Sequence, residues 1–384
     1  MDHQKHLFEL PEQVTYLNGA YMSPQLKAVT QAGIEAIHRK SRPYEIESTD
    51  FFIGRTLLKQ RFASLINAPD PEDTAIIPSV SYGLANAAQN IELGPQDEIV
   101  LLKEQFPSNV YCWHERALQT GAIVKNVMPP ETFSERAVTW NKAILEAITP
   151  KTKVVAIPHI HWADGTMYDL KAIRAKTKEY NAFLIIDGTQ SIGALPFSVS
   201  EIQPDALVCG GYKWMLGPYA LGMAYYAKSL QKGIPIEQNW MNRLGSDDFA
   251  GLVDYKDTYQ PKAGRFSVGE SSNFILLPML TKAIEQLLEW GIENIQEYCQ
   301  KISADSVSKL RTMGCFVEDD RHRAHHLFGV FPPAGTDLSK LNRLLKENNI
   351  FISFRGKVIR VSPSVYNTTY EIEKLVHCFE KVLS

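Results

Sequence analysis

Lys213 lies in an environment that is unusual for a surface lysine. Its segment, 208–217 (VCGGYKWMLG), is composed of glycines, aromatic residues, a methionine and small apolar residues. Burial lowers the pKa of a lysine and frees its amine for Schiff-base chemistry. Gly210 and Gly211 allow the backbone to approach a ligand closely. The alternative is a surface lysine whose stem covers apolar neighbours, which these surroundings make less attractive.

Asp187 comes directly after a short apolar run in the segment 185–190, IIDGTQ. A carboxylate at the end of a strand can pair with a protonated ring nitrogen and hold its positive charge. Gln190, three residues later, can hydrogen-bond a neighbouring ring hydroxyl. A structural role, in which Asp187 caps the next helix, is an equally common use of aspartate at such a position.

The segment 76–86, IIPSVSYGLAN, places small and hydroxyl residues between an expected strand and an expected helix. Exposed backbone N–H groups at such a junction, here near Val80 and Ser81, bind phosphate well. A simple serine N-cap is the commoner explanation for this pattern when it stands alone.

Arg360 lies in the β-rich segment 358–368, VIRVSPSVYNT. The guanidinium group can bind a carboxylate through two parallel hydrogen bonds. A structural ion pair is the alternative.

Short buried strands alternate with helices through the first two thirds of the chain, which predicts a parallel α/β sheet covered on both faces. Ser23 and Pro24 predict the start of one helix, Ser134 caps a second and Asp169 caps a third. The strands are expected at 153–158, 182–186, 206–209 and 222–226, and the helices at 23–40, 134–148 and 169–180. Ligands of such sheets bind beyond the carboxyl ends of the strands, which is where Asp187 falls.

The pattern changes after about residue 274 and predicts a smaller α+β domain. We expect a large domain over 15–273 and a small domain formed by 1–14 and 274–384. In the small domain the helices are expected at 277–289, 293–313, 337–348 and from about 368, and the strands at 327–331, 350–353 and 358–361.

The composition excludes several classes of protein. The 384 residues carry a net charge of −3 without a basic stripe, which argues against a nucleic-acid partner. The five scattered cysteines show neither metal nor disulfide spacing. The N-terminus has no apolar core of signal-peptide length, and no apolar run reaches the roughly 18 residues of a membrane span. We therefore expect a cytoplasmic protein without a membrane partner.

Taken together, the four segments resemble the class V aminotransferase family of fold-type I pyridoxal-5′-phosphate (PLP) enzymes, which includes cysteine desulfurases, kynureninase and isopenicillin N epimerase. The resemblance runs from about residue 16 (YLNGAYMSP) to 366–368. It implies an α/β fold with a mainly parallel sheet in the large domain and a smaller α+β C-terminal domain. It also implies PLP as cofactor, a small-molecule amino acid as substrate and a homodimer.

The resemblance assigns roles around the cofactor residue by residue. Lys213 matches the catalytic lysine that forms the Schiff base and then moves the substrate proton. Asp187 matches the partner of the pyridine nitrogen, and Gln190 matches the contact to the ring oxygen. Val80 and Ser81 match the phosphate-binding pair.

Other matches concern the ring faces and the substrate. Phe106, in EQFPSN, matches the residue that stacks on the cofactor ring. Tyr212 stands where relatives often have a phosphate-binding histidine, and its hydroxyl can serve the same end. Arg360 matches the arginine that grips the substrate carboxylate. Trp162 replaces a small polar residue and makes the pocket more aromatic, and His161, after an expected strand, is a further candidate for the pocket wall.

Two departures from the family pattern limit the function. Desulfurases carry a reactive cysteine shortly before the carboxylate-binding arginine, but 344–359 contains none and Cys315 is too far upstream. A persulfide mechanism is therefore disfavoured. In RFSVGESSN, Glu270 replaces a threonine that reaches the partner subunit's phosphate, and Ser271 or Ser272 can substitute for it.

The sequence thus predicts a PLP-dependent aminotransferase. A lyase (selenocysteine lyase, desulfurase-like or kynureninase-like) and an epimerase are the alternatives on the same scaffold, and a non-catalytic PLP-binding protein is the alternative outside enzymes. The histidine-rich segment 319–326, DDRHRAHH, has no partner motif for a closed metal site. We expect it to be a polar loop and predict no metal.

Overall fold

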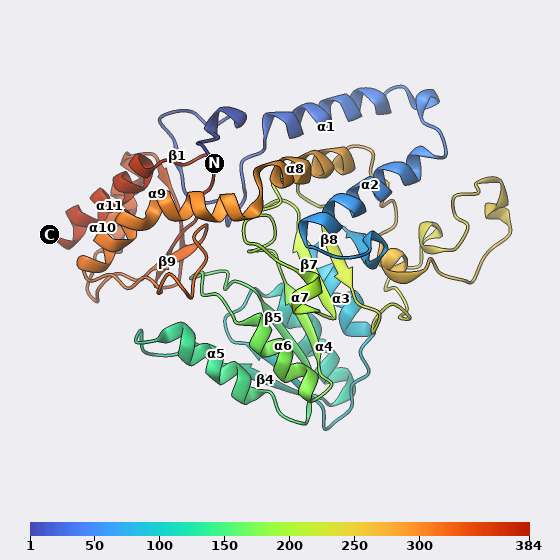
Figure 1. The fold of residues 1–384 in the computed structure, drawn as a ribbon, viewed down its shortest axis with the longest axis horizontal. Coiled ribbons are helices and arrows are strands. Elements are labelled where there is room, and N and C mark those ends of the chain that lie inside the picture. The colour runs from blue at the N-terminus through green and yellow to red at the C-terminus, as the bar shows by residue number, and fades with distance from the viewer.

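The computed structural model describes residues 1–384 and is built around a seven-stranded sheet (Figure 1). The strand order is β2-β8-β7-β6-β5-β3-β4. The bounds are β2 (Thr74–Ile77), β3 (Glu98–Leu102), β4 (Ile123–Val127), β5 (Thr152–Pro158), β6 (Phe183–Asp187), β7 (Ala206–Gly210) and β8 (Gly222–Tyr226). The four strands expected in this region are therefore confirmed to within one or two residues.

Both faces of the sheet are covered by helices, as the apolar runs in its central strands require. In β6, Leu184 and Ile186 join one apolar cluster and Ile185 joins the other. The apolar cluster on one face includes residues of α1 (Lys27–Lys40), α2 (Asp50–Leu65), α5 (Arg136–Ala147), α6 (Leu170–Glu179), α7 (Val199–Ile202) and α8 (Leu276–Trp290). The cluster on the other face includes residues of α3 (Val80–Gln89) and α4 (Ser108–Thr120).

Strand β8 is antiparallel to both of its neighbours, β7 and β2, whereas the other strands pair in parallel. The connection from β7 to β8, residues 211–221, is too short for the crossover helix that a parallel pair needs. Strands β2 and β7 consequently run in the same direction. The carboxyl ends of β2, β3, β5, β6 and β7 therefore meet at one edge of the sheet, where β8 begins.

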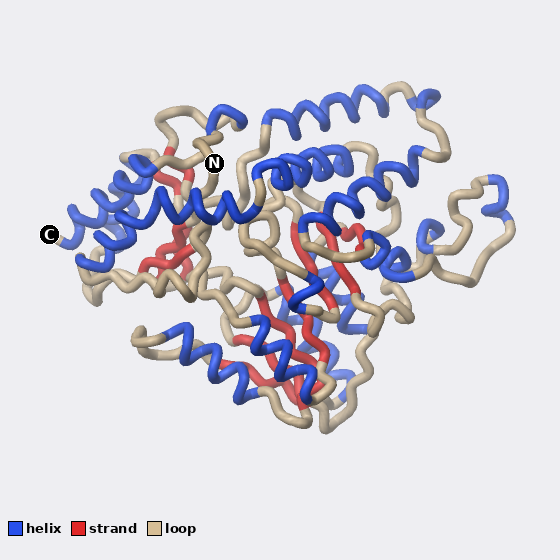
Figure 2. Tube along the Cα trace, viewed as in Figure 1, coloured by secondary structure: helices blue, strands red, loops and turns tan.

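The C-terminal region forms a second, smaller sheet beside this body (Figure 2). Strand β12 lies between β11 and β9 and is antiparallel to both, and β1 pairs in parallel with β10. The elements are β1 (Thr15–Tyr16), α9 (Ile292–Thr312), β9 (Phe328–Val330), α10 (Leu338–Glu347), β10 (Ile350–Phe351), β11 (Ser353–Arg355), β12 (Val358–Val361) and α11 (Thr369–Leu383). Helix α8 packs against α1 and α2 of the large body, and the domain boundary near residue 274 stays a prediction.

Two of the predicted helix starts are wrong. Helix α1 begins only at Lys27, without a side-chain cap, because the chain before it runs extended past the loop after β7, where the Ser23 N–H donates to the Tyr212 carbonyl. Helix α5 begins at Arg136 after Glu135, whose left-handed backbone (φ 47°) separates it from Ser134. The Asp169 cap is confirmed, since its carboxylate accepts the Ala172 N–H at 3.0 Å.

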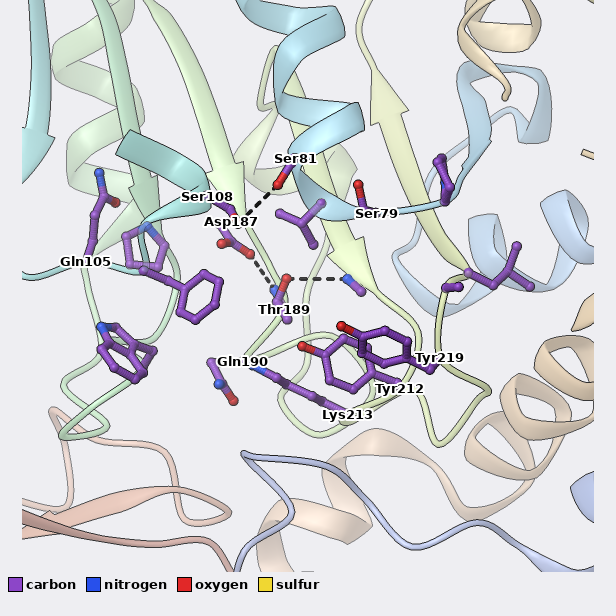
Figure 3. A pocket seen from close by; sticks show the side chains of 18 of the residues that line it. Ser79, Ser81, Gln105, Ser108, Asp187, Thr189, Gln190, Tyr212, Lys213 and Tyr219 are labelled. Carbon is purple, nitrogen blue, oxygen red and sulfur yellow. Dashed lines mark hydrogen bonds between the residues drawn. The ribbon is translucent and has the colours of Figure 1, made fainter. Parts of the chain in front are cut away.

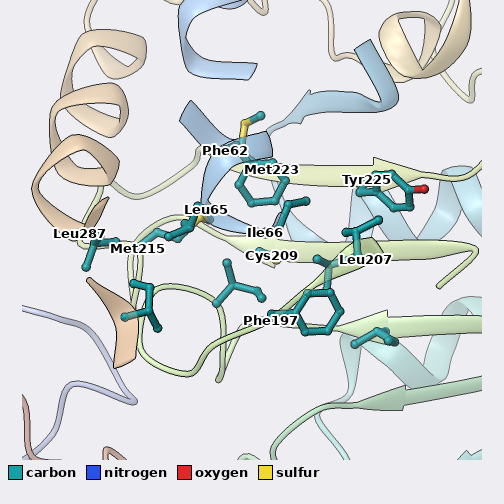
Figure 4. Packing of buried hydrophobic residues seen from close by; sticks show 14 of the residues in the cluster. Phe62, Leu65, Ile66, Phe197, Leu207, Cys209, Met215, Met223, Tyr225 and Leu287 are labelled. Carbon is teal, nitrogen blue, oxygen red and sulfur yellow. The ribbon is translucent and has the colours of Figure 1, made fainter. Parts of the chain in front are cut away.

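A buried apolar cluster anchors the loop that carries Lys213 (Figure 4). Met215, two residues after the lysine, packs in the same cluster as Leu287 of α8 and Cys209 of β7. The loop also closes on itself, because the Gly211 N–H donates to the Leu221 carbonyl and the Gly217 N–H donates to the Gly211 carbonyl, each at 2.9 Å. The position of Lys213 is therefore fixed by packing on both sides.

None of the helices combines the length and the apolar character that a bilayer crossing requires.

Candidate active site

A pocket of about 310 Å³ lies at the edge where the carboxyl ends of the strands meet (Figure 3). A second hollow of about 280 Å³ adjoins it and shares part of its wall. The residues common to both are Phe106, Trp162, Tyr212, Lys213 and Tyr219. Of the residues predicted for the site, Val80, Ser81, Phe106, Trp162, Asp187, Gln190, Tyr212 and Lys213 line the first hollow, and Arg360 lines the second.

Lys213 is almost fully buried, with 6% of its surface exposed, and it makes no ion pair. Its Nζ lies 5.4 Å from the ring centroid of Phe106 and 5.5 Å from that of Tyr212. Burial lowers the pKa of Lys213 from its usual range to about 8, with Asp187 opposing this shift and Arg360 adding to it. At pH 7 roughly a tenth of the amine is therefore neutral, and hence nucleophilic, which is far more than for an exposed lysine.

Asp187 ends β6 at the floor of the pocket and is also buried, at 6% exposed. Burial raises the pKa of its carboxyl group, although the hydrogen bond from the Thr189 N–H to Oδ1, at 2.9 Å, favours the ionised form. No lysine, arginine or histidine forms a salt bridge with this carboxylate in the structure. A buried acid without a cationic partner is a group that a protonated ring nitrogen would stabilise.

The first turn of α3 forms another part of the wall. Ser79 is the N-cap, and its hydroxyl accepts the Tyr82 N–H at 3.2 Å. The N–H groups of Val80 and Ser81 belong to the set that no helical carbonyl can satisfy. The Ser81 hydroxyl donates to Ser108 Oγ at 3.1 Å, at the start of α4 (Figure 3). This arrangement suits an anion, because unpaired N–H groups and two hydroxyls gather at one helix end.

Aromatic side chains enclose the middle of the site. The rings of Phe106 and Trp162 meet edge to face at 5.5 Å, and those of Tyr212 and Tyr219 do so at 4.7 Å. The Trp162 Nε1–H donates to the Glu104 carbonyl at 2.7 Å, which holds the indole in place. These faces can pack on a planar ring and keep water away from Lys213.

Gln190 lines the pocket, but its side-chain amide already has two partners. Its Oε1 accepts the Trp214 Nε1–H at 2.9 Å, and its Nε2 donates to the Ala20 carbonyl at 3.1 Å. Only the second amide hydrogen is free for a ring oxygen. The Gln190 carbonyl accepts a hydrogen bond from His326 Nε2 at 2.8 Å, so this part of the segment 319–326 supports the pocket from behind. No group of three or more metal-ligating side chains occurs in the chain.

Arg360 borders the second hollow from β12. It is 1% exposed, its Nη1 donates to the Trp162 carbonyl at 2.8 Å, and its Nε has no partner. Burial, and then the charge of Arg355, lower the pKa of Arg360 to about 9. No carboxylate of the chain pairs with it, so the structure does not support the structural ion pair as the explanation for this arginine.

The structure does not bring His161 to the wall of either hollow. Its Nδ1 lies 3.0 Å from Asp164 Oδ1, and Asp164 in turn pairs with Arg136 at 3.0 Å. These contacts hold the imidazole outside the pocket and beside Trp140, whose ring centroid lies 5.1 Å from that of His161. The sequence could not show that network, because Arg136 is 25 positions upstream of His161.

Gly210 and Gly211 have different roles. Gly210 lines the pocket, and a Cβ there would lie 3.3 Å from the Tyr212 ring. A Cβ on Gly211 would lie 2.5 Å from the Leu221 carbonyl oxygen. Gly211 therefore serves the closure of the loop rather than the approach of a ligand.

Several residues of the wall were missed from the sequence. Thr189 and Gln105 follow the ends of β6 and β3 closely and could have been found from that position, while Ser108, at the start of α4, and Tyr219 carry no such signal. Arg355, in the second hollow, was also missed. Glu270, Ser271 and Ser272 line neither hollow, and their predicted contact with a partner subunit stays a prediction.

We expect the amine of Lys213 to react at lower pH than an exposed lysine. A surface lysine has a pKa of about 10.4, whereas that of Lys213 is lowered to about 8. Reductive methylation with formaldehyde, analysed by peptide mass spectrometry between pH 6 and pH 11, should label Lys213 with a midpoint near that value in cofactor-free protein. Lys228, which is exposed, is the internal control. A midpoint for Lys213 equal to that of Lys228 would contradict the assignment.

Comparison with known proteins gives the family. The family model described as "Aminotransferase class-V" matches residues 36–375. A relative from Bacillus subtilis, the uncharacterized aminotransferase YcbU, is 27% identical over 86% of this chain and 83% of its own length. A cysteine desulfurase from Synechococcus elongatus is 26% identical over 90% of this chain and 56% of its own.

Solved structures share the whole fold. The cysteine desulfurase CsdA from Escherichia coli matches with a TM-score of 0.82 over 99% of this chain and 97% of that one, at 19% identity. A mutant of the protein C-DES, solved with glycine covalently linked to its PLP cofactor, matches with a TM-score of 0.86 over 97% and 98%, also at 19% identity. These likenesses confirm the predicted fold-type I α/β architecture, and the match to the family model shows that the chain belongs to the aminotransferase class-V family.

Proposed function

We propose that the chain binds PLP and transfers the α-amino group of a small amino acid, with Lys213 as the residue that holds the cofactor and moves the proton. The observation that carries the proposal is that a buried, partly neutral lysine and a buried, unpaired aspartate line one pocket with the first turn of α3.

The residues of the pocket fit PLP group by group. The N–H groups of Val80 and Ser81 would hold the phosphate, with help from the hydroxyls at the start of α3 and α4. Asp187 would keep the pyridine nitrogen protonated. The resulting ion pair would offset the free-energy cost of burying the Asp187 charge without a partner. Phe106 would cover the ring, and Gln190 has one amide hydrogen free for the ring oxygen.

When bound, PLP supplies an electron sink that accepts the electron pair released at the substrate Cα. For amino transfer, a group of the protein must remove the Cα proton and deliver a proton to the cofactor. Lys213 Nζ is the basic group in the pocket, because Asp187 is committed to the ring and no histidine lines the wall. A pKa of about 8 suits both steps, since a general base works best near the ambient pH. Arg360 would hold the substrate carboxylate, and the surrounding aromatic rings would exclude water.

A PLP-dependent lyase is the second candidate, because relatives and structural neighbours include cysteine desulfurases. None of the five cysteines lines either hollow, so a route through a protein persulfide has no nucleophile here. A lyase that needs no cysteine, or an epimerase, begins with the same proton removal at Cα.

A substrate screen separates these reactions. We expect PLP-loaded protein mixed with an amino acid, without any keto acid, to lose its visible absorbance as the cofactor takes the amino group. A keto acid should restore that absorbance. Release of a side-chain fragment with the visible band retained would favour the lyase, and racemisation without either change would favour the epimerase. A bound cofactor that reacts with no amino acid would favour a non-catalytic role.

A further inference from the structure

The wall of the second hollow includes a cationic side chain, that of Arg355, which has no role in the proposed reaction. Its wall includes three cationic side chains, Lys213, Arg355 and Arg360, and no acidic one. In the adjoining pocket Asp187 is the only acid. A single substrate carboxylate would form an ion pair with Arg360 and leave Arg355 without an anionic partner.

The β11–β12 hairpin directs both arginines to the same side. A two-residue turn, Gly356 and Lys357, sets the register so that Ser353 lies opposite Arg360. Because side chains alternate along a strand, Arg355 shares the face of Ser353, and therefore of Arg360. The observed bond from Arg360 Nη2 to Ser353 Oγ, at 3.4 Å, is consistent with this common face. Ile359 and Phe354 point the other way, into the apolar cluster of the C-terminal region.

Both guanidinium groups border the same indole. The Cζ of Arg355 lies 5.4 Å from the Trp162 ring centroid, and that of Arg360 lies 6.0 Å from it. The Cζ atoms of the two arginines therefore cannot lie farther apart than the sum of these two distances. The Nε of each arginine is buried without a hydrogen-bond partner, and neither pairs with a carboxylate of the chain. Two unpaired guanidinium groups facing one hollow form a site for two anionic groups on one ligand.

We propose that Arg355 selects an amino acid whose side chain ends in an acidic group, with Arg360 binding the α-carboxylate and Arg355 the distal one. The inference rests on the proposed function and narrows its substrate to dicarboxylic amino acids of aspartate or glutamate type. A purely structural role, in which Arg355 only stacks on Trp162 and donates to the Phe354 carbonyl, would give no such preference.

The test uses ligands that cannot react, so that binding is measured apart from turnover. Succinate and butyrate have the same chain length and differ by one carboxylate. Isothermal titration calorimetry of PLP-loaded protein should show succinate bound about 10- to 100-fold more tightly than butyrate, as expected for one additional hydrogen-bonded charge pair. The Arg355→Gln variant should bind the two acids alike, and Arg355→Lys should retain part of the preference.

Arg343→Gln is the matched control, because Arg343 is a largely exposed arginine on α10 whose only ion pair is with Glu347. It should keep the wild-type preference. Equal binding of succinate and butyrate by the wild type, or an undiminished preference in Arg355→Gln, would overturn the inference. Protein that takes amino groups from neutral amino acids yet shows no preference for succinate would leave the proposed function standing. Failure of the proposed function itself is seen separately, as a visible cofactor band that is absent or that no amino acid removes.

Discussion

Replacing Lys213 by alanine is expected to abolish the covalent attachment of PLP and to lower kcat by about 10²- to 10⁴-fold, the contribution usual for a positioned general base. The visible band of lysine-bound cofactor, at about 420 nm, should disappear. Noncovalent binding should persist, because the N–H groups at the start of α3 and the Asp187 carboxylate are untouched. Absorbance spectra and equilibrium dialysis with PLP measure these two effects separately.

Two comparisons show whether the loss is due to the amine itself. Lys228→Ala removes an exposed lysine 15 positions away and should leave the spectrum and kcat unchanged. Ethylamine should partly restore turnover to the Lys213→Ala protein, because the truncated side chain leaves room beside Phe106 and Tyr212. A Lys213→Ala protein that keeps both the visible band and near-normal turnover would refute the assignment of the lysine.

The position of Asp187 could be predicted because the information is local. A run of β-branched and apolar residues ends at a carboxylate, and the parallel arrangement places every such end at one edge of the sheet. Lys213 could be predicted for a related reason, since its apolar neighbours Trp214 and Met215 are the residues that bury the loop. The local sequence pattern is sufficient to predict a site residue where the conformation of its strand or loop is determined by the residues of that same segment.

The misses depend on contacts between distant segments. Arg355 faces the second hollow because of the register of the β11–β12 hairpin. No property of its neighbours in the sequence distinguishes it from a surface arginine. His161 is drawn out of the pocket by Asp164 and Arg136. Ser23 does not cap a helix because its segment is held extended against the Lys213 loop. Each outcome is decided by tertiary packing, which overrides local propensity.

The Asp187→Asn variant is expected to affect stability and activity in opposite directions. In the cofactor-free protein, burial raises the pKa of the Asp187 carboxyl. A group whose pKa is raised by folding stabilises the folded state only at low pH, and its contribution is lost as the pH rises above the value of about 3.9 in the unfolded chain. Asparagine, which has the same shape and no charge, should therefore raise the Tm of the cofactor-free protein at pH 7 and make little difference at pH 4.

In the PLP-loaded protein the same substitution should lower kcat by about 10²- to 10⁴-fold, because removing one partner of a buried charge pair costs about 3–5 kcal/mol. Glu237→Gln, which alters an acid outside both hollows, is the control for a general effect of charge. Thermal melts at the two pH values and steady-state kinetics supply the measurements. A fall in the Tm of the cofactor-free Asp187→Asn protein would mean that the carboxylate holds the fold together. A rise in Tm combined with a loss of turnover would mean instead that Asp187 is maintained, at a cost to stability, for the positive charge of a bound ring.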